Sequence, residues 1–187
     1  MADRPKDVVR EDDLEWSEQE HGERFGHRRK RLAEAAGGRR VGCSLYEVES
    51  GRAACPRHYH LANEEAIYVR EGSGTLRLGL EGEEVTVSRG DYVALPTGTE
   101  GAHQLVNTSG SVLRYLCLST VEEPDVMVYP DSGKVGIYAG EAAGEPKEEG
   151  TIAEFLRNDA EVGYYYLHAT EVGYYDGEED QGAIRKE

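Results

Sequence analysis

Two separate segments of the chain contain residues suited to binding a metal ion. The first holds His58, His60 and Glu65, and the second holds His103. Three imidazoles and one carboxylate suit a divalent transition metal such as Mn, Fe, Zn or Ni, and this donor set excludes little within that group. Four protein ligands on an octahedral ion leave two positions for substrate, dioxygen or water, as a reactive site requires.

The spacing of these residues is compatible with one shared cavity. Residues two apart in a strand point to the same face, so His58 and His60 can direct both imidazoles inward. Glu65 follows a short loop at the start of the next expected strand, and its neighbour Glu64 would then face outward. His103 opens another strand far along the chain, so the four side chains can meet only if the fold closes on itself.

The elements that must position these residues have the pattern of short strands separated by turns rich in Gly and Ser. The expected strands span residues 41–48, 66–70, 75–80, 84–87, 92–95, 103–106 and 112–118. Apolar and polar residues alternate clearly around Leu76 and Thr86, and no stretch between the strands is long enough for a crossover helix. This pattern predicts an all-β antiparallel sandwich or barrel.

The chain divides into three parts, and its length fits one domain with extensions. We expect residues 1–40 to form an N-terminal arm, 41–120 the β-barrel core, and 121–187 an acidic, Tyr-rich C-terminal extension. The stretch 11–24 is highly charged with few apolar anchors, which indicates an arm that lies over other parts of the protein. The acidic residues 141–150, rich in Gly and Ala, have the composition of a linker.

The extension contains weaker signals for further elements. Two more strands are expected at 126–129 and 134–138. Thr151 and Glu154 have the spacing of a capping box ahead of apolar residues, which predicts a short helix near 152–158.

Aromatic residues outside the core suggest further packing or association. The pentapeptide Glu-Val-Gly-Tyr-Tyr occurs at 161–165 and again at 171–175, and we expect these tyrosines to pack on the barrel or on a second subunit. Trp16, Phe25 and Phe155 are apolar anchors that a small barrel alone can hardly cover. Because exposed apolar patches usually mark interfaces, we expect a homodimer.

The charge distribution argues against nucleic acid as a partner. The net charge is −16, divided as 0 in residues 1–40, −4 in 41–120 and −12 in 121–187. Such a field repels phosphate backbones. The basic run Arg-Arg-Lys-Arg at 28–31 is expected to be a solvated strand edge.

Other classes of protein are disfavoured by the apolar and cysteine content. No apolar stretch approaches the roughly 20 residues that cross a bilayer, and the start of the chain lacks the apolar segment of a signal peptide. We therefore expect a cytoplasmic protein without a membrane partner. Cys43, Cys55 and Cys117 fit neither a disulfide scaffold nor a Cys-x-x-Cys metal site, so they are expected to be small buried thiols.

The two metal-binding segments resemble the paired motifs of the cupin superfamily. The first motif is carried by Gly51, His58, His60, Glu65 and Gly72, and the second by Gly90, Pro96, Gly98, His103 and Asn107. The chain departs from the pattern by one extra residue before the first histidine and by four residues, rather than two, before the last. Its flanks resemble small single-domain cupins of the cupin 2 type, mostly of uncharacterised activity and in some cases provisionally labelled sugar-phosphate isomerases.

The resemblance implies a single jelly-roll β-barrel with metal ligands at His58, His60, Glu65 and His103, but it implies no reaction. Three functions stay open. The metal could assist isomerisation or lyase chemistry on a small polar metabolite such as a sugar, a sugar phosphate or a hydroxy or keto acid. It could be Fe(II) in a dioxygenase, or the protein could bind a metal or small ligand without catalysis.

The sequence assigns no catalytic residue, so whether the chain is an enzyme stays open at this stage. Tyrosines are the most numerous candidates for a proton donor or hydrogen-bond donor. They are Tyr46, Tyr68, Tyr92 and Tyr115, and structural packing is the expected role of each.

Overall fold

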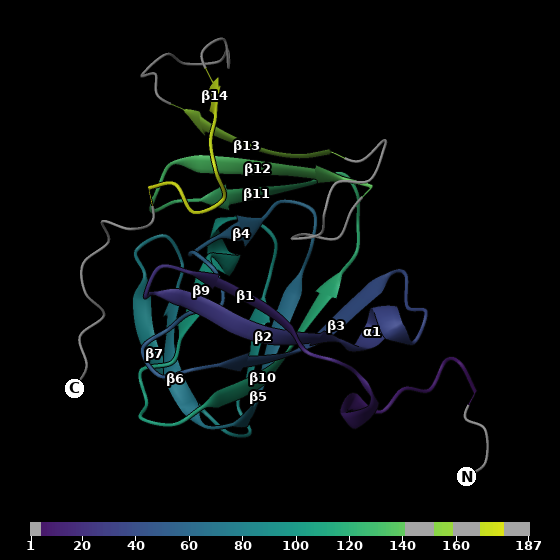
Figure 1. The fold of residues 1–187 in the computed structure, drawn as a ribbon. Coiled ribbons are helices and arrows are strands. Elements are labelled where there is room, and N and C mark those ends of the chain that lie inside the picture. The colour runs from purple at the N-terminus through teal and green to yellow at the C-terminus, as the bar shows by residue number, and fades with distance from the viewer. Residues whose placement is uncertain (1–4, 141–151, 159–168, 178–187) are drawn as a thin grey trace.

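The computed structural model describes residues 5–140, 152–158 and 169–177, and this part of the chain is folded almost entirely as β-strands (Figure 1). The strands are β1 (Ser17–His21), β2 (Phe25–Arg31), β3 (Val41–Val48), β4 (Tyr59–His60), β5 (Glu65–Glu71), β6 (Ser73–Leu78), β7 (Glu83–Ser88), β8 (Tyr92–Leu95), β9 (His103–Val106), β10 (Leu113–Thr120), β11 (Asp125–Tyr129), β12 (Lys134–Ala139), β13 (Ile152–Asn158) and β14 (Ala169–Glu171). The short helices are η1 (Glu11–Asp13), α1 (Leu32–Ala35) and η2 (Thr99–Gly101).

Three sheets enclose one interior in the jelly-roll manner. A six-stranded sheet has the order β1-β2-β3-β10-β5-β8, a three-stranded sheet the order β7-β6-β9, and a five-stranded sheet the order β14-β13-β12-β11-β4. In Figure 1 the first of these crosses the front of the molecule and the last lies above it. Every pairing between named strands is antiparallel, as the sequence pattern predicts.

The core forms where apolar residues of alternating pattern meet inside these sheets. Its main cluster includes Val48, Val69, Leu76, Leu105 and Leu113, all at most 4 % exposed. Apolar burial on this scale is the main favourable contribution to folding. The alternation of apolar and polar residues in the sequence therefore corresponds to side chains that point into and away from this core.

The seven strands predicted between residues 41 and 118 are all present. β3, β8 and β9 have the predicted bounds, and the others differ by at most two residues at an end. β6 begins at Ser73, earlier than predicted, because Gly72 makes the turn from β5 with a φ of 81°. A Cβ at Gly72 would lie 2.6 Å from the backbone oxygen of Val112, so glycine also permits a close approach there.

The arm contributes strands to the largest sheet. β2 pairs with β3, and β1 pairs with β2 at the sheet edge. The prediction of a solvated edge at residues 28–31 is therefore wrong. Lys30 is only 8 % exposed, because its ammonium group lies 4.6 Å from the ring of Trp16 and donates a 2.7 Å hydrogen bond to the backbone oxygen of Glu11.

The short helix predicted near residues 152–158 is also wrong, because this segment is strand β13. It pairs with β12 from Ala139↔Ile152 to Lys134↔Arg157. The edge of β12 offers hydrogen-bond partners along the whole segment, and Phe155 packs against the rings of Tyr129 and Tyr138. These tertiary contacts outweigh a local capping signal. The part of the chain that the structure describes contains one α-helix, α1 in the arm.

The second copy of the tyrosine pentapeptide packs on the barrel. Tyr174 meets the ring of Tyr129 edge-on at 5.8 Å, and Tyr175 stacks on His21 at 4.2 Å. Phe25 is buried within the chain beside Tyr175. The first copy, at 161–165, and the predicted linker at 141–150 lie outside the described residues. The homodimer stays a prediction.

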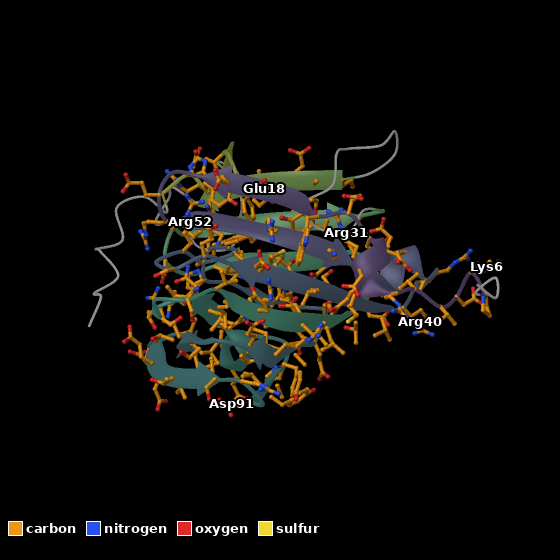
Figure 2. The ribbon with its side chains drawn as sticks, turned by 60° about the horizontal axis from the view of Figure 1, so that its bottom comes forward. Lys6, Glu18, Arg31, Arg40, Arg52 and Asp91 are labelled. Carbon is orange, nitrogen blue, oxygen red and sulfur yellow. The ribbon has the colours of Figure 1, made fainter. Side chains whose placement is uncertain are left out.

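The outer surface carries many charged side chains, including the exposed Glu18 of β1, Arg40 just before β3 and Asp91 just before β8 (Figure 2). No helix in the described ranges is long and apolar enough to cross a membrane.

Candidate metal centre

The four predicted ligands meet inside the barrel although they come from distant parts of the chain. His60 lies in β4, Glu65 begins β5, and His103 begins β9. His58 precedes β4 and exchanges two backbone hydrogen bonds with His103, of 3.1 and 2.9 Å. All four side chains are nearly excluded from solvent, at 12 % exposure or less. Glu64, as predicted, is exposed.

The ligand-type atoms converge on one point. Oε2 of Glu65 lies 3.8 Å from Nε2 of His58, 3.4 Å from Nε2 of His60 and 3.4 Å from Nε2 of His103. The ligand atoms of His58, His60 and Glu65 all lie within 4.8 Å of one another. Three imidazole nitrogens therefore surround one carboxylate oxygen.

The two extra residues before His103 are absorbed without displacing it. They belong to η2, which follows Gly98 (φ 79°) and ends at Gly101. A Cβ at Gly101 would lie 1.7 Å from the backbone oxygen of Pro96, so the turn can close this tightly only with glycine at that position. His103 then enters β9 opposite Leu78 of β6.

Each histidine ring is oriented by a hydrogen bond at its other nitrogen. Nδ1 of His58 lies 2.8 Å from the backbone oxygen of Pro56, and Nδ1 of His103 lies 3.0 Å from that of Gly101. A carbonyl can only accept, so each Nδ1 carries the proton and leaves Nε2 with a lone pair directed inward.

His60 differs from the other two histidines because its orienting partner is a carboxylate. Nδ1 of His60 lies 2.5 Å from Oδ2 of Asp125, whose Oδ1 accepts a 3.1 Å hydrogen bond from the backbone nitrogen of Ala62. Carboxylate–histidine pairs of this kind hold the ring and raise its basicity as a metal ligand. Asp125 begins β11 and is itself buried.

Burial and mutual charge separate the pKa values of these groups. Burial lowers the pKa of His58 to about 3, helped by the neighbouring imidazoles, and also lowers the pKa of His103. Burial opposes protonation of His60 too, but the carboxylates of Glu65 and Asp125 outweigh it and raise its pKa to about 10. Burial would raise the pKa of Glu65, yet the imidazoles, above all His60, hold it well below its usual range.

The donor set fits a divalent transition metal. Oε2 of Glu65 and Nε2 of His60 are buried without a hydrogen-bond partner. Such atoms are costly unless another group satisfies them. A metal ion held by the three Nε2 atoms and the Glu65 carboxylate would satisfy both, and nitrogen and oxygen donors in this ratio suit Mn, Fe, Zn or Ni.

Sequence reasoning missed three residues that touch the ligands. Sγ of Cys117 lies 3.6 Å from Oε1 of Glu65, and Sγ of Cys55 lies 3.8 Å from Nδ1 of His58. Asp125 is the third. The cysteines Cys43, Cys55 and Cys117 are all half-buried, and none of them forms a disulfide. The prediction of small buried thiols is therefore only partly right. Their place beside the ligands depends on strand register, which the sequence does not display.

The four candidate tyrosines divide between the two sides of the barrel wall. Tyr46 and Tyr115 stack inside at 5.2 Å, and burial raises the pKa of both hydroxyls. Tyr68 and Tyr92 are 40 % and 65 % exposed. The inner pair belongs to the core, as the packing interpretation predicts, and it shares the inner face with the ligands.

Comparison with known proteins agrees with this geometry. Residues 44–119 match the family described as "Cupin domain". No curated protein matches the sequence.

Many solved structures resemble the chain, among them the following three. A provisionally assigned sugar phosphate isomerase from Acidithiobacillus ferrooxidans has 26 % identity and a TM-score of 0.63, covering 71 % of this chain and 86 % of its own. A sugar phosphate isomerase of the cupin superfamily from Silicibacter pomeroyi has 25 % identity and a TM-score of 0.67, with coverages of 81 % and 93 %. The polyketide cyclase RemF from Streptomyces resistomycificus has 27 % identity and a TM-score of 0.51, with coverages of 67 % and 84 %.

Proposed function

We propose, from the premise that residues 44–119 form a cupin domain, that this protein binds one divalent transition metal inside its barrel. The ligands are His58, His60, Glu65 and His103. We further propose that the metal serves isomerase or lyase chemistry on a small polar metabolite. The similarity to two proteins described as sugar phosphate isomerases supports this choice of reaction class over oxygenation.

The observation that carries the proposal is the convergence of three imidazole nitrogens on a carboxylate oxygen that has no hydrogen-bond partner. A purely structural cluster of buried polar groups would be expected to satisfy its members within the chain. Here the Nδ1 atoms of the three rings are satisfied, while the inward-facing atoms Nε2 of His60 and Oε2 of Glu65 are not. The unsatisfied atoms are those that a metal would contact.

The residues of the chain prepare this site in three ways. The Nδ1 contacts hold each ring with Nε2 inward, so little reorganisation is needed on binding. The low exposure of all four ligands limits access of water. When bound, the metal would polarise a carbonyl or hydroxyl oxygen of the substrate as a Lewis acid. A tyrosine hydroxyl is protonated at neutral pH, and burial raises the pKa of Tyr46 further, so this group can donate a hydrogen bond.

Measurement of the metal content of protein purified without chelators tests the proposal. We expect close to one transition metal ion per wild-type chain, and a sharp fall in the His60→Ala and Glu65→Ala variants. Glu64→Ala is the matched control, because Glu64 is the exposed neighbour of Glu65 and its loss should leave the metal content unchanged.

The identity and amount of bound metal separate the candidate functions. Zn or Mn in the wild-type protein would support isomerase or lyase chemistry, whereas Fe would favour a dioxygenase. Unchanged metal content in His60→Ala would contradict the ligand assignment. A wild-type protein that binds no metal would leave a module that binds small ligands without metal chemistry.

A further inference from the structure

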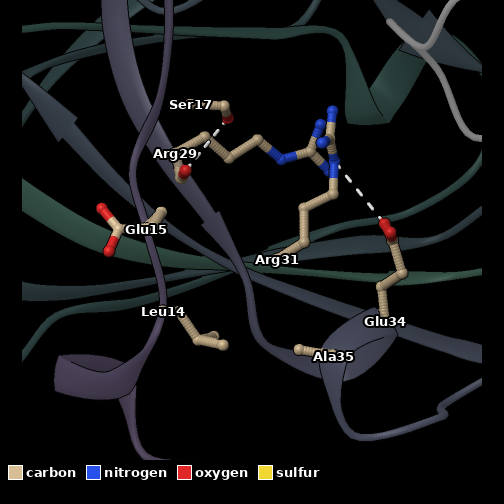
Figure 3. Close-up of a pocket in the computed structure, with 7 residues that line it drawn as sticks. All are labelled: Leu14, Glu15, Ser17, Arg29, Arg31, Glu34 and Ala35. Atoms are coloured by element: carbon tan, nitrogen blue, oxygen red, sulfur yellow. Dashed lines mark hydrogen bonds and ion pairs between the residues drawn. The ribbon is translucent and has the colours of Figure 1, made fainter.

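A second group of polar residues faces the same interior as the metal centre but has no part in holding the metal. A pocket lies where β1, β2 and α1 meet, and two arginines, Arg29 and Arg31, line it together (Figure 3). Both belong to β2, two residues apart. The same pocket is also lined by Glu15 and Glu34, so its lining carries both basic and acidic side chains.

Strand register places both arginines on the inner face of the six-stranded sheet. Arg29 lies opposite Tyr46, and Arg31 lies opposite Ser44. Ser44 in turn lies opposite Cys117 across the next pairing. Side chains of directly opposed residues share a face, so these residues face the interior that also holds Glu65.

Arg29 is held in place without being neutralised. Its Nε donates a 3.0 Å hydrogen bond to Oγ of Ser44, and its guanidinium lies 5.3 Å from the ring centre of Tyr46. A hydroxyl and an aromatic ring orient the group but supply no negative charge. No carboxylate of the described residues forms an ion pair with Arg29.

The ion pair between Arg31 and Glu34 is long and partly exposed. Nε of Arg31 lies 3.7 Å from Oε2 of Glu34, a side chain that is 68 % exposed. An ion pair of this length and exposure contributes little by itself, and Arg31 has further contacts besides it. In Figure 2, Arg31 lies beside α1.

A continuous set of contacts links the arginines to the metal centre. Arg29 contacts Ser44, Ser44 pairs with Cys117, and Cys117 contacts Oε1 of Glu65. These residues lie on β2, β3, β10 and β5, which are successive strands of one sheet. Three strand spacings amount to about 14 Å between the backbones of β2 and β5. The Arg29 charge also acts on the Cys117 thiol, which places the guanidinium on the side of the sheet that holds Glu65.

We propose that Arg29 and Arg31 form a subsite for the oxyanion group, phosphate or carboxylate, of the substrate. This inference rests on the proposed metal-assisted function and narrows its substrate to an anionic small metabolite. Guanidinium groups match phosphate and carboxylate in geometry and stay charged at all physiological pH values. In a chain of net charge −16, such a binding point must be local, because the overall field repels anions.

Binding of two probes to the full-length protein tests the subsite. Inorganic phosphate and acetate are titrated separately by calorimetry, which distinguishes a phosphate from a carboxylate preference. We expect Arg29→Gln to weaken the preferred probe by about ten- to a hundredfold, as for loss of a charge-assisted contact, with part of the affinity restored in Arg29→Lys. Arg31→Gln is measured in parallel and keeps the test decisive if Arg29→Gln does not fold.

The control is Arg28→Gln, which makes the same charge change on the same strand but on the outer face. It should change the Kd of the probe less than twofold. His60→Ala, measured with the same probe, should keep binding that depends on Arg29 even though the metal is lost. This result separates failure of the subsite from failure of the metal proposal.

The subsite is refuted if neither probe binds, or if Arg29→Gln and Arg31→Gln bind as the wild type does. An equal loss in Arg28→Gln would also refute it, because the effect would then reflect net charge and not the inner face. Unchanged metal content in Arg29→Gln confirms that the variant is folded when its probe affinity falls.

Discussion

The two faces of the six-stranded sheet treat charge in opposite ways. On the outer face, Glu47 accepts hydrogen bonds from Arg28 and Arg114, and Arg114 reaches Glu71 at 2.8 Å. On the inner face, Arg29 has no carboxylate partner among the described residues, and Oε2 of Glu65 has no hydrogen-bond partner.

This difference shows how alternate residues of the same strands serve separate purposes. Outer charges neutralise one another at a surface where water can also assist, and they hold neighbouring strands together. On the inner face, Arg29 is held by the hydroxyl of Ser44, whereas Glu65 is held by the imidazoles around it and by the thiol of Cys117. A half-buried guanidinium without a carboxylate partner and a buried carboxylate oxygen without a hydrogen-bond partner are both positions that a ligand can complete.

The largest effect on metal affinity should come from a change at Asp125, which lies in the five-stranded sheet and contacts the ligand His60. Its carboxylate is used by His60 and the backbone of Ala62. Asp125→Asn removes the charge but keeps the shape, and we expect metal affinity to fall about 10- to 100-fold, as is typical for such partners. Competition with a chelator measures this affinity.

Asp131→Asn is the control for Asp125→Asn, because Asp131 is an equally buried carboxylate that pairs with Arg57 and Arg77 instead of a ligand. Its metal affinity should match the wild type. If both variants lose affinity equally, Asp125 acts through general stability and not through His60.

Much of the fold could be predicted because local patterns specify it. Short β-rich runs between turn residues predict β3, β8 and β9 with their observed bounds, and motif spacing predicts all four residues that converge in the candidate centre. These features depend on residues close together in the sequence or on spacings that recur. Neither requires knowledge of which strands pair.

What could not be predicted depends on pairing between distant segments. Asp125 reaches His60 because β11 pairs with β4, and Cys117 reaches Glu65 because β10 pairs with β5. The prediction of a helix near 152–158 was wrong for the same reason, because this segment pairs with the edge of β12 as a strand. Arg29 faces inward only through its register with β3, so the composition of the run 28–31 could not reveal it.

A smaller effect is expected on the outer face, where stability and metal binding should separate. The Glu47 side chain is 8 % exposed and accepts hydrogen bonds from Arg28 and Arg114, whose side chains are about two-fifths exposed. We expect Glu47→Gln to lower the free energy of unfolding by about 1–2 kcal/mol, since two charge-assisted hydrogen bonds weaken. Denaturant unfolding measures this change, and metal content should stay at the wild-type value.

Glu71→Gln serves as the matched control on the same face. Glu71 is 61 % exposed, and an exposed ion pair contributes at most about 1 kcal/mol. The contrast between the two faces would be broken if Glu47→Gln removed the metal, because outer charges would then support the inner site directly.

The smallest effect concerns His27, an inner-face residue that is neutral and already satisfied. Its Nδ1 lies 3.1 Å from the backbone oxygen of Ala54, and burial, helped by Arg29, lowers its pKa from 6.5 to about 4. The unfolded chain takes up a proton at His27 as the pH falls below 6.5, while the folded protein does not until about 4. Protonation therefore favours unfolding in this window and has no effect above it.

We expect the wild type to lose about 1 kcal/mol of unfolding free energy relative to His27→Gln between about pH 7.5 and 5.5. The comparison with His27→Gln cancels the contributions of the metal ligands, whose environment is the same in both proteins. Denaturant unfolding of the two proteins at each pH measures the difference. Parallel curves would show that His27 takes up its proton as readily in the folded protein as in the unfolded one, and that burial on the inner face does not by itself keep a group neutral.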